Sequence, residues 1–186
     1  MESVISPSEI HKLDPRAIMF GWTPEKRFVL MESVPISRNV PEHVHRLIVT
    51  SKNLIIHSCH YYPFNVTAMQ AAFSALELAI NLRAEAEGKT AVFRGLRDAM
   101  DHAVRNSWIS DVGLPIPQIP KALQITPRGE LEEIDSPVLR QYVEVLAKFM
   151  PKIRNALAHG SSYMNSNGAN RVLMINHLVN QLFPEL

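Results

Sequence analysis

Apolar residues recur at every third or fourth position along most of the chain, which is the spacing of helices that bury one face. The pattern predicts about five helices, over residues 41–63, 65–88, 92–108, 136–160 and 170–183. The sequence does not show the alternation of strand and helix patterns that builds a parallel sheet. We therefore expect an all-α fold in which about five helices form an antiparallel bundle.

Residues 1–40 do not share this pattern, and prolines interrupt them at positions 7, 15, 24 and 35. Residues 18–22 and 27–31 fit two short strands that flank a turn. Thr23 followed by Pro24 fits equally well the start of a helix, with the threonine as N-cap and the proline at the first helical position. Both alternatives stay open, and we expect a small irregular or short-β attachment at the N-terminus.

The helical domain is expected to span residues 41–186 and to contain a proline-rich loop over residues 109–135. A connection of this length is typical of a lid, an interface element or an exposed loop, and the sequence leaves these alternatives open. Pro151 stands inside the helix predicted over 136–160. We expect a kink there, because the proline ring removes one backbone hydrogen bond.

The helix predicted over residues 65–88 is apolar on nearly all sides, which is typical of a helix packed on several neighbours. Its polar residues follow steps of four, three and four and therefore share one narrow face; they are Gln70, Ser74, Glu77 and Asn81. This polar seam is either the one solvent-facing edge of a central helix or the wall of a polar groove that contains Glu77. The pattern fits both.

Composition narrows the class of protein. The chain has 186 residues, of which 46% are hydrophobic and 20% charged, as in an ordinary one-domain soluble protein. A net charge of +1 provides no general basic field, so contact with nucleic acid would need a local patch. Cys59 is the only cysteine, which excludes an intrachain disulfide and a cysteine-based zinc cluster. We see neither a signal-peptide pattern nor an apolar run of membrane-spanning length and expect a cytoplasmic protein.

The candidate chemistry lies at the end of the helix predicted over 136–160, where Arg154, Asn155 and His159 precede Gly160. Histidine transfers protons near neutral pH, and arginine stabilises negative charge on phosphate. Together they suit the cleavage of a polyanion. Basic residues in the last turn before a glycine are also ordinary at helix C-termini, so a purely structural role stays open.

The neighbourhood of this motif lacks negative charge. No aspartate or glutamate occurs between Glu144 and Glu185, whereas Lys148, Lys152 and Arg171 fall within that interval. We expect these three side chains to bind the phosphates of a substrate, because basic side chains unopposed by carboxylates attract polyanions.

The segment from Arg154-Asn155 to His159, placed at the end of a long helix, resembles the motif of the HEPN superfamily (higher eukaryotes and prokaryotes nucleotide-binding domain). That motif is an arginine, usually a following polar residue, and a histidine four to six positions further on. The segment from Phe73 to Glu77 resembles the second helix of the family, which carries an acidic residue. The resemblance covers residues 41–183 and implies a HEPN-like bundle.

Active HEPN proteins are metal-independent endoribonucleases, commonly toxins or defence effectors. The resemblance therefore implies that His159 is the acid or base, Arg154 the stabiliser of the phosphorane and Asn155 the group that orients them. Glu77 would be a supporting carboxylate, and neither a metal nor a cofactor is implied. Members of the family commonly form homodimers, in which two motifs face one cleft.

Two functions are consistent with these expectations. The first is an endoribonuclease that acts as a homodimer on RNA and is restrained by an antitoxin or another regulatory protein. The second is a non-catalytic HEPN-like module for dimerisation or for binding a nucleotide or partner protein, in which the motif residues serve as structural caps. Cleavage of RNA that disappears in a His159 variant would distinguish the first from the second.

Overall fold

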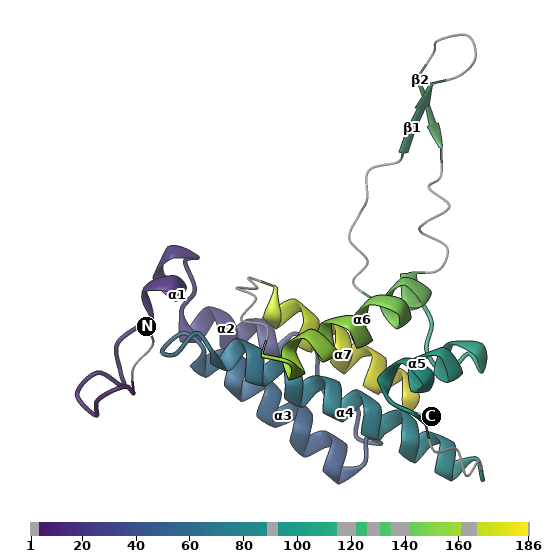
Figure 1. Cartoon of the computed structure of the whole chain (residues 1–186), viewed down its shortest axis with the longest axis horizontal. Helices are drawn as coiled ribbons and strands as arrows, with labels where there is room; N and C mark the ends of the chain where they lie inside the picture. The colour runs from purple at the N-terminus through teal and green to yellow at the C-terminus, as the bar shows by residue number, and fades with distance from the viewer. Residues whose placement is uncertain are drawn as a thin grey trace.

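The computed structural model describes residues 4–88, 93–114, 122–125, 131–134, 142–160 and 167–185. Within these ranges the chain forms seven helices and one pair of strands (Figure 1). The elements are α1 (Pro15–Met19), α2 (Pro24–Glu32), α3 (Glu42–His57), α4 (Phe64–Ala86), α5 (Leu96–Arg105), β1 (Ala122–Ile125), β2 (Leu131–Ile134), α6 (Tyr142–Ala158) and α7 (Gly168–Leu182). The all-α class is confirmed. Among the described helices, none combines the length and apolar character that crossing a bilayer would require.

Helix α4 is the centre of the bundle. It packs against α3, α5, α6 and α7, and Figure 1 shows α3 along one side of it and α6 and α7 along the other. Ala68, Ala72, Ala75 and Ala79 are fully buried and let neighbouring helices approach closely, while Phe73 fills the core between them. The central position expected from its nearly all-round apolar pattern is confirmed.

The five helices predicted from periodicity correspond to α3–α7, with shifted ends. α3 ends at His57, before the predicted end at residue 63, and α5, which the periodicity extends over 92–108, is confined to Leu96–Arg105. Gly95 has φ 132° and Ser107 has φ 56°, and neither conformation continues a right-handed helix. The side chain of Asn65 does not cap α4, since its amide donates to the carbonyl of Tyr62 at 3.0 Å.

The N-terminal segment is helical, so the short-strand alternative for residues 18–22 and 27–31 is wrong. The helix-start alternative is confirmed at α2. Pro24 occupies its first turn, and the Thr23 hydroxyl oxygen accepts a hydrogen bond from the backbone N–H of Lys26 at 3.3 Å. A proline with preset φ and a capping hydroxyl favour a helix more strongly than a short apolar run favours a strand.

Helix α2 belongs to the same core as the bundle, because Met31 and Val34 pack within the common apolar cluster. The carbonyl of Val34 accepts hydrogen bonds from the Lys52 ammonium at 2.6 Å and the Asn176 amide at 2.8 Å. Both donors are buried and come from α3 and α7. The core therefore continues through the boundary that the sequence places at residue 40.

Asp14 connects the first helix to the bundle. Its carboxylate accepts hydrogen bonds from the Arg16 guanidinium at 2.8 Å and from the backbone N–H of Tyr62 at 3.0 Å. The hydrogen bond from Arg16 is the main cause that lowers the pKa of Asp14 to about 2. The buried carboxylate thus stabilises the folded state in its ionised form.

We expect Asp14→Asn to lower the free energy of unfolding by about 2 kcal/mol near pH 7. The folded pKa lies below the ordinary value of 3.8, so the ionised carboxylate stabilises the protein above about pH 4. This contribution is lost as the pH falls towards 2. Urea unfolding should therefore show a difference between the two proteins that is full at pH 6 and much smaller at pH 2.5. A difference independent of pH would contradict the role of the ionised group.

The loop predicted over residues 109–135 contains structure of its own. β1 and β2 pair antiparallel, with Ala122 opposite Ile134, while residues 115–121, 126–130 and 135–141 lie outside the described part of the chain. The Asp111 carboxylate accepts hydrogen bonds from the backbone N–H groups of Tyr142 at 2.9 Å and Val143 at 2.7 Å. Asp111, which precedes the hairpin in the sequence, therefore provides acceptors for two backbone N–H groups at the described start of α6. The role of this segment as lid or interface stays a prediction.

Candidate functional site

Arg154 and Asn155 lie near the end of α6, and His159 is the first residue after it. The helix ends at Ala158, and the backbone N–H of His159 still donates to the carbonyl of Asn155 at 3.0 Å. Gly160 has φ 78°, a left-handed conformation that glycine adopts without the strain of a Cβ atom. Pro151 lies inside α6 and is buried, while the kink expected at this position stays a prediction.

Arg154 lies between Asn155 and Glu77. One guanidinium nitrogen is 3.4 Å from the amide oxygen of Asn155, and another is 3.8 Å from a carboxylate oxygen of Glu77. Both contacts are long, and the side chain of Arg154 is 45% exposed. The structure thus brings three of the four predicted catalytic residues together and leaves N–H donors of the guanidinium available to another acceptor.

The polar seam of α4 lies partly against the end of α6. Gln70 donates a hydrogen bond to the carbonyl of Leu157 at 3.2 Å, and Glu77 approaches Arg154 about two helical turns further along α4. Ser74 between them is exposed. Glu77 is three-quarters buried and faces the basic residue of another helix, whereas Ser74 is exposed, so both alternatives for the seam stay predictions.

A cleft of about 440 Å³ lies between the start of α5 and the second half of α6. From α6 it is lined by Pro151, Arg154 and Asn155. From the α5 side it is lined by Arg94, Gly95, Leu96, Arg97, Asp98 and Asp101. Its charged lining therefore consists of three arginines and two aspartates, an excess of one positive charge, and the Glu77 carboxylate beside Arg154 offsets that charge.

Arg94 and Arg97 were not among the residues predicted for the site. The backbone N–H of Arg94 donates to Asp98 at 3.4 Å, and the Arg97 guanidinium is 3.9 Å from Asp101. The contact of Arg97 with Asp101 is a long ion pair between exposed side chains, so it is weak, whereas the contact of Arg94 with Asp98 involves only the backbone of Arg94. No local pattern in the sequence could have connected these arginines with Arg154, because their proximity depends on how α5 packs against α6.

His159 does not join this cleft. It is exposed, and no side-chain hydrogen bond or ion pair of its ring occurs among the residues that the structure describes. Positions 154 and 159 are separated by about 140° around a helix axis, because each residue advances by about 100°. Within one chain the arginine and the histidine therefore point to different sides of α6.

The three cations predicted to bind substrate are also dispersed. Lys148 lies in a shallow depression beside Asp101, Arg105 and Glu144. Lys152 is exposed, with its ammonium 5.3 Å from the centre of the Phe149 ring. These two positions differ by one helical turn and share a face of α6.

Arg171 belongs to a different site. It extends from α7 into a cavity that the cleft residues do not line, and one guanidinium nitrogen is 3.7 Å from the sulfur of Met69. Burial lowers the pKa of Arg171 from its ordinary value. The structure does not bring Arg171 to the cleft that contains Arg154.

Within the described ranges, no group of three or more His, Cys, Asp or Glu side chains is arranged to hold a metal ion. No protein-family model matches the chain, and no curated protein and no solved structure matches it either. The resemblance to the HEPN superfamily therefore stays a prediction from the motif and the bundle.

Proposed function

We propose that the protein is a metal-independent endoribonuclease of the HEPN type, with a site shared by two protomers. The observation that carries this proposal is the position of Arg154. Its guanidinium lies beside Asn155 and Glu77 at a cleft that Arg94 and Arg97 also line. Guanidinium groups at a cleft suit the recognition and cleavage of a phosphodiester, because their N–H donors bind phosphate oxygens.

The reaction is an internal displacement at phosphorus. The 2′-oxygen of a ribose attacks the adjacent phosphate, the bond from phosphorus to the 5′-oxygen breaks, and a 2′,3′-cyclic phosphate remains. One proton leaves the 2′-hydroxyl and one joins the departing 5′-oxygen. His159 would exchange these protons, and the N–H groups of Arg154 would bind the phosphorane oxygens, on which negative charge increases. Asn155 and Glu77 would orient the guanidinium.

The orientation of His159 supports a shared site. Because His159 and Arg154 face different sides of α6, a second copy would provide the histidine that the cleft of the first copy lacks. A two-fold dimer does this reciprocally, since the same surface of each copy contacts the other. Such an enzyme would harm its host when unrestrained, so we also propose an antitoxin or regulatory protein as a further partner.

We expect purified protein to cleave a mixed single-stranded RNA pool at the same rate with and without excess EDTA. The products should carry 2′,3′-cyclic phosphate ends, which resist labelling at the 3′ end until acid opens the ring and a phosphatase removes the remaining phosphate. Complete loss of cleavage in EDTA would contradict a metal-independent mechanism. Absence of cleavage of every RNA offered would favour the non-catalytic binding or dimerisation module, in which Arg154 joins α6 to α4 through Glu77.

Arg97→Gln should weaken RNA binding and reduce the dependence of binding on salt. Each phosphate contact to a single strand contributes a slope of about 0.7 in log K against log salt concentration, so losing one contact should lower the slope by about that amount. Fluorescence anisotropy with a labelled RNA at several salt concentrations measures both effects. Arg46→Gln is the control, because Arg46 is equally exposed but lies on α3, where it pairs with Glu42. Equal effects of the two substitutions would exclude a specific role for Arg97.

A further inference from the structure

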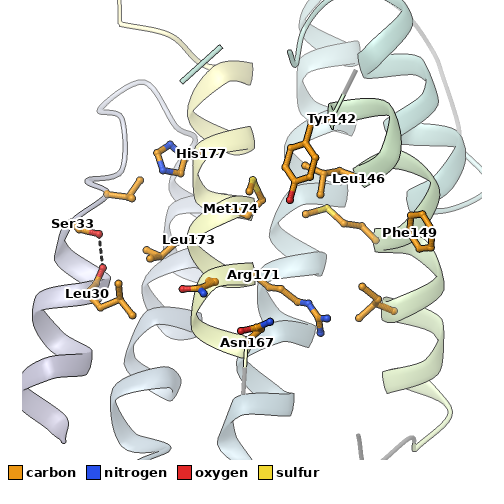
Figure 2. A pocket seen from close by; sticks show the side chains of 14 residues that line it. Leu30, Ser33, Tyr142, Leu146, Phe149, Asn167, Arg171, Leu173, Met174 and His177 are labelled. Atoms are coloured by element: carbon orange, nitrogen blue, oxygen red, sulfur yellow. Dashed lines mark hydrogen bonds between the residues drawn. The ribbon is translucent and has the colours of Figure 1, made fainter. Parts of the chain in front are cut away.

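A second cavity lies between α2, α6 and α7 (Figure 2). Its volume is about 590 Å³, within the range of about 300–1,000 Å³ that is typical of small-molecule sites. The lining is largely apolar and includes Leu30, Leu146, Phe149, Ile153, Leu173 and Met174. Cavities of this size and composition bind ligands whose bulk is apolar, with a few polar groups that fix the orientation.

Arg171 is the charged group of this cavity. Figure 2 shows its side chain extending from α7 towards α6. Its one described side-chain contact is with the sulfur of Met69, which is a weak acceptor. Among the described residues no carboxylate pairs with it, and the sequence has no Asp or Glu between Glu144 and Glu185.

A partly buried guanidinium without an anion is costly, because it loses hydration and gains no opposite charge in return. Among the residues that the structure describes, the start of α7 also lacks a negatively charged partner. Asn167 and Asn170 line the cavity at that end, and the first turn of α7 has no acidic residue. Both the helix dipole and Arg171 therefore favour an anion at the same end of the cavity.

We propose that this cavity binds a small molecule with an apolar body and one carboxylate or phosphate group. The apolar body lies between α6 and α7, against side chains such as Phe149 and Ile153, and the anion pairs with Arg171. The site is separate from the proposed ribonuclease cleft. Phe149 and Ile153 line the cavity on one side of α6, whereas Pro151 and Arg154 line the cleft on another.

Isothermal titration calorimetry with decanoate, decyl phosphate and decanol tests the proposal, with each probe below its micelle-forming concentration. We expect saturable binding of one molecule per chain for at least one anion, about tenfold or more tighter than for decanol, since a charge-assisted pair is formed only by the anions. Comparison of decanoate with decyl phosphate distinguishes the two head groups.

Arg171→Gln should reduce binding of the preferred anion to the level of decanol, while Arg46→Gln, which removes an exposed cation on α3 outside the cavity, should leave it unchanged. Ile153→Trp should fill the cavity and weaken binding of all three probes. Circular dichroism establishes that each variant is folded. The proposal would be overturned if the anions and decanol bound equally well, or if no probe showed saturable binding. It would also be overturned if the two cation variants had equal effects, or if Ile153→Trp bound the probes as the wild type does.

Discussion

Replacing His159 by alanine should lower the rate of RNA cleavage by about 10²- to 10⁴-fold, the usual contribution of a positioned acid or base. The same change should alter the free energy of unfolding by less than about 0.5 kcal/mol, because His159 is exposed. Single-turnover cleavage of a fluorescent RNA measures the first quantity, and urea unfolding measures the second. A large loss of activity without a loss of stability would assign chemistry rather than structure to this residue.

His45→Ala is the matched control, since His45 is an exposed histidine on α3, a helix that does not line the cleft. It should cleave RNA at the wild-type rate. If His159→Ala also retains that rate, the ribonuclease proposal fails and the non-catalytic alternative takes its place.

The His159 variant also tests whether two copies share a site. If Arg154 of one copy acts with His159 of the other, a mixture of Arg154→Ala and His159→Ala proteins forms heterodimers in which one of two sites is intact. Because random pairing of two species gives heterodimers in half of the dimers, activity should recover to about a quarter of the wild-type value. A mixture as inactive as its components would show that the two groups do not act in this way across copies.

The parts of the fold that the sequence predicts well are those with a long periodic signal. The nearly all-round apolar pattern of residues 65–88 correctly places α4 in the centre, because a helix with little polar surface must be covered by several neighbours. The short apolar runs around Thr23 and Pro24 fit two structures, and only the observed cap at Thr23 decides between them. Five residues are too few for periodicity to distinguish a strand from a helical turn.

In the candidate site, too, features set by local sequence are predicted well and features set by helix packing are not. The end of α6 just before Gly160 follows from local chemistry and agrees with the prediction. The presence of Arg94 and Arg97 beside Arg154, and the absence of Arg171 from that cleft, depend on which faces of α5, α6 and α7 meet. Counting charges along the sequence cannot show which helix faces meet. The interval without carboxylates therefore contains Arg154 and Arg171, which the structure places in two separate sites.

Phe73→Ala should have the largest effect on stability among the substitutions considered. Phe73 is 1% exposed at the middle of α4, and truncation of a fully buried phenylalanine costs about 3–5 kcal/mol through lost apolar contacts and the remaining cavity. That is a large part of the roughly 5–15 kcal/mol that holds a typical domain folded. Urea unfolding followed by circular dichroism measures the change as a lower midpoint with an unchanged m-value.

Ser74→Ala provides the control at the next position of the same helix. Ser74 is exposed and its hydroxyl donates to the carbonyl of Gln70 at 3.0 Å, a local bond whose loss should change stability by less than about 0.5 kcal/mol. The contrast between the two neighbours tests the orientation of α4 directly, because rotation of the helix by one residue would exchange their environments. Similar costs for both substitutions would mean that the polar seam does not face outward at Ser74, and the position of Glu77 beside Arg154 would then lose its structural basis.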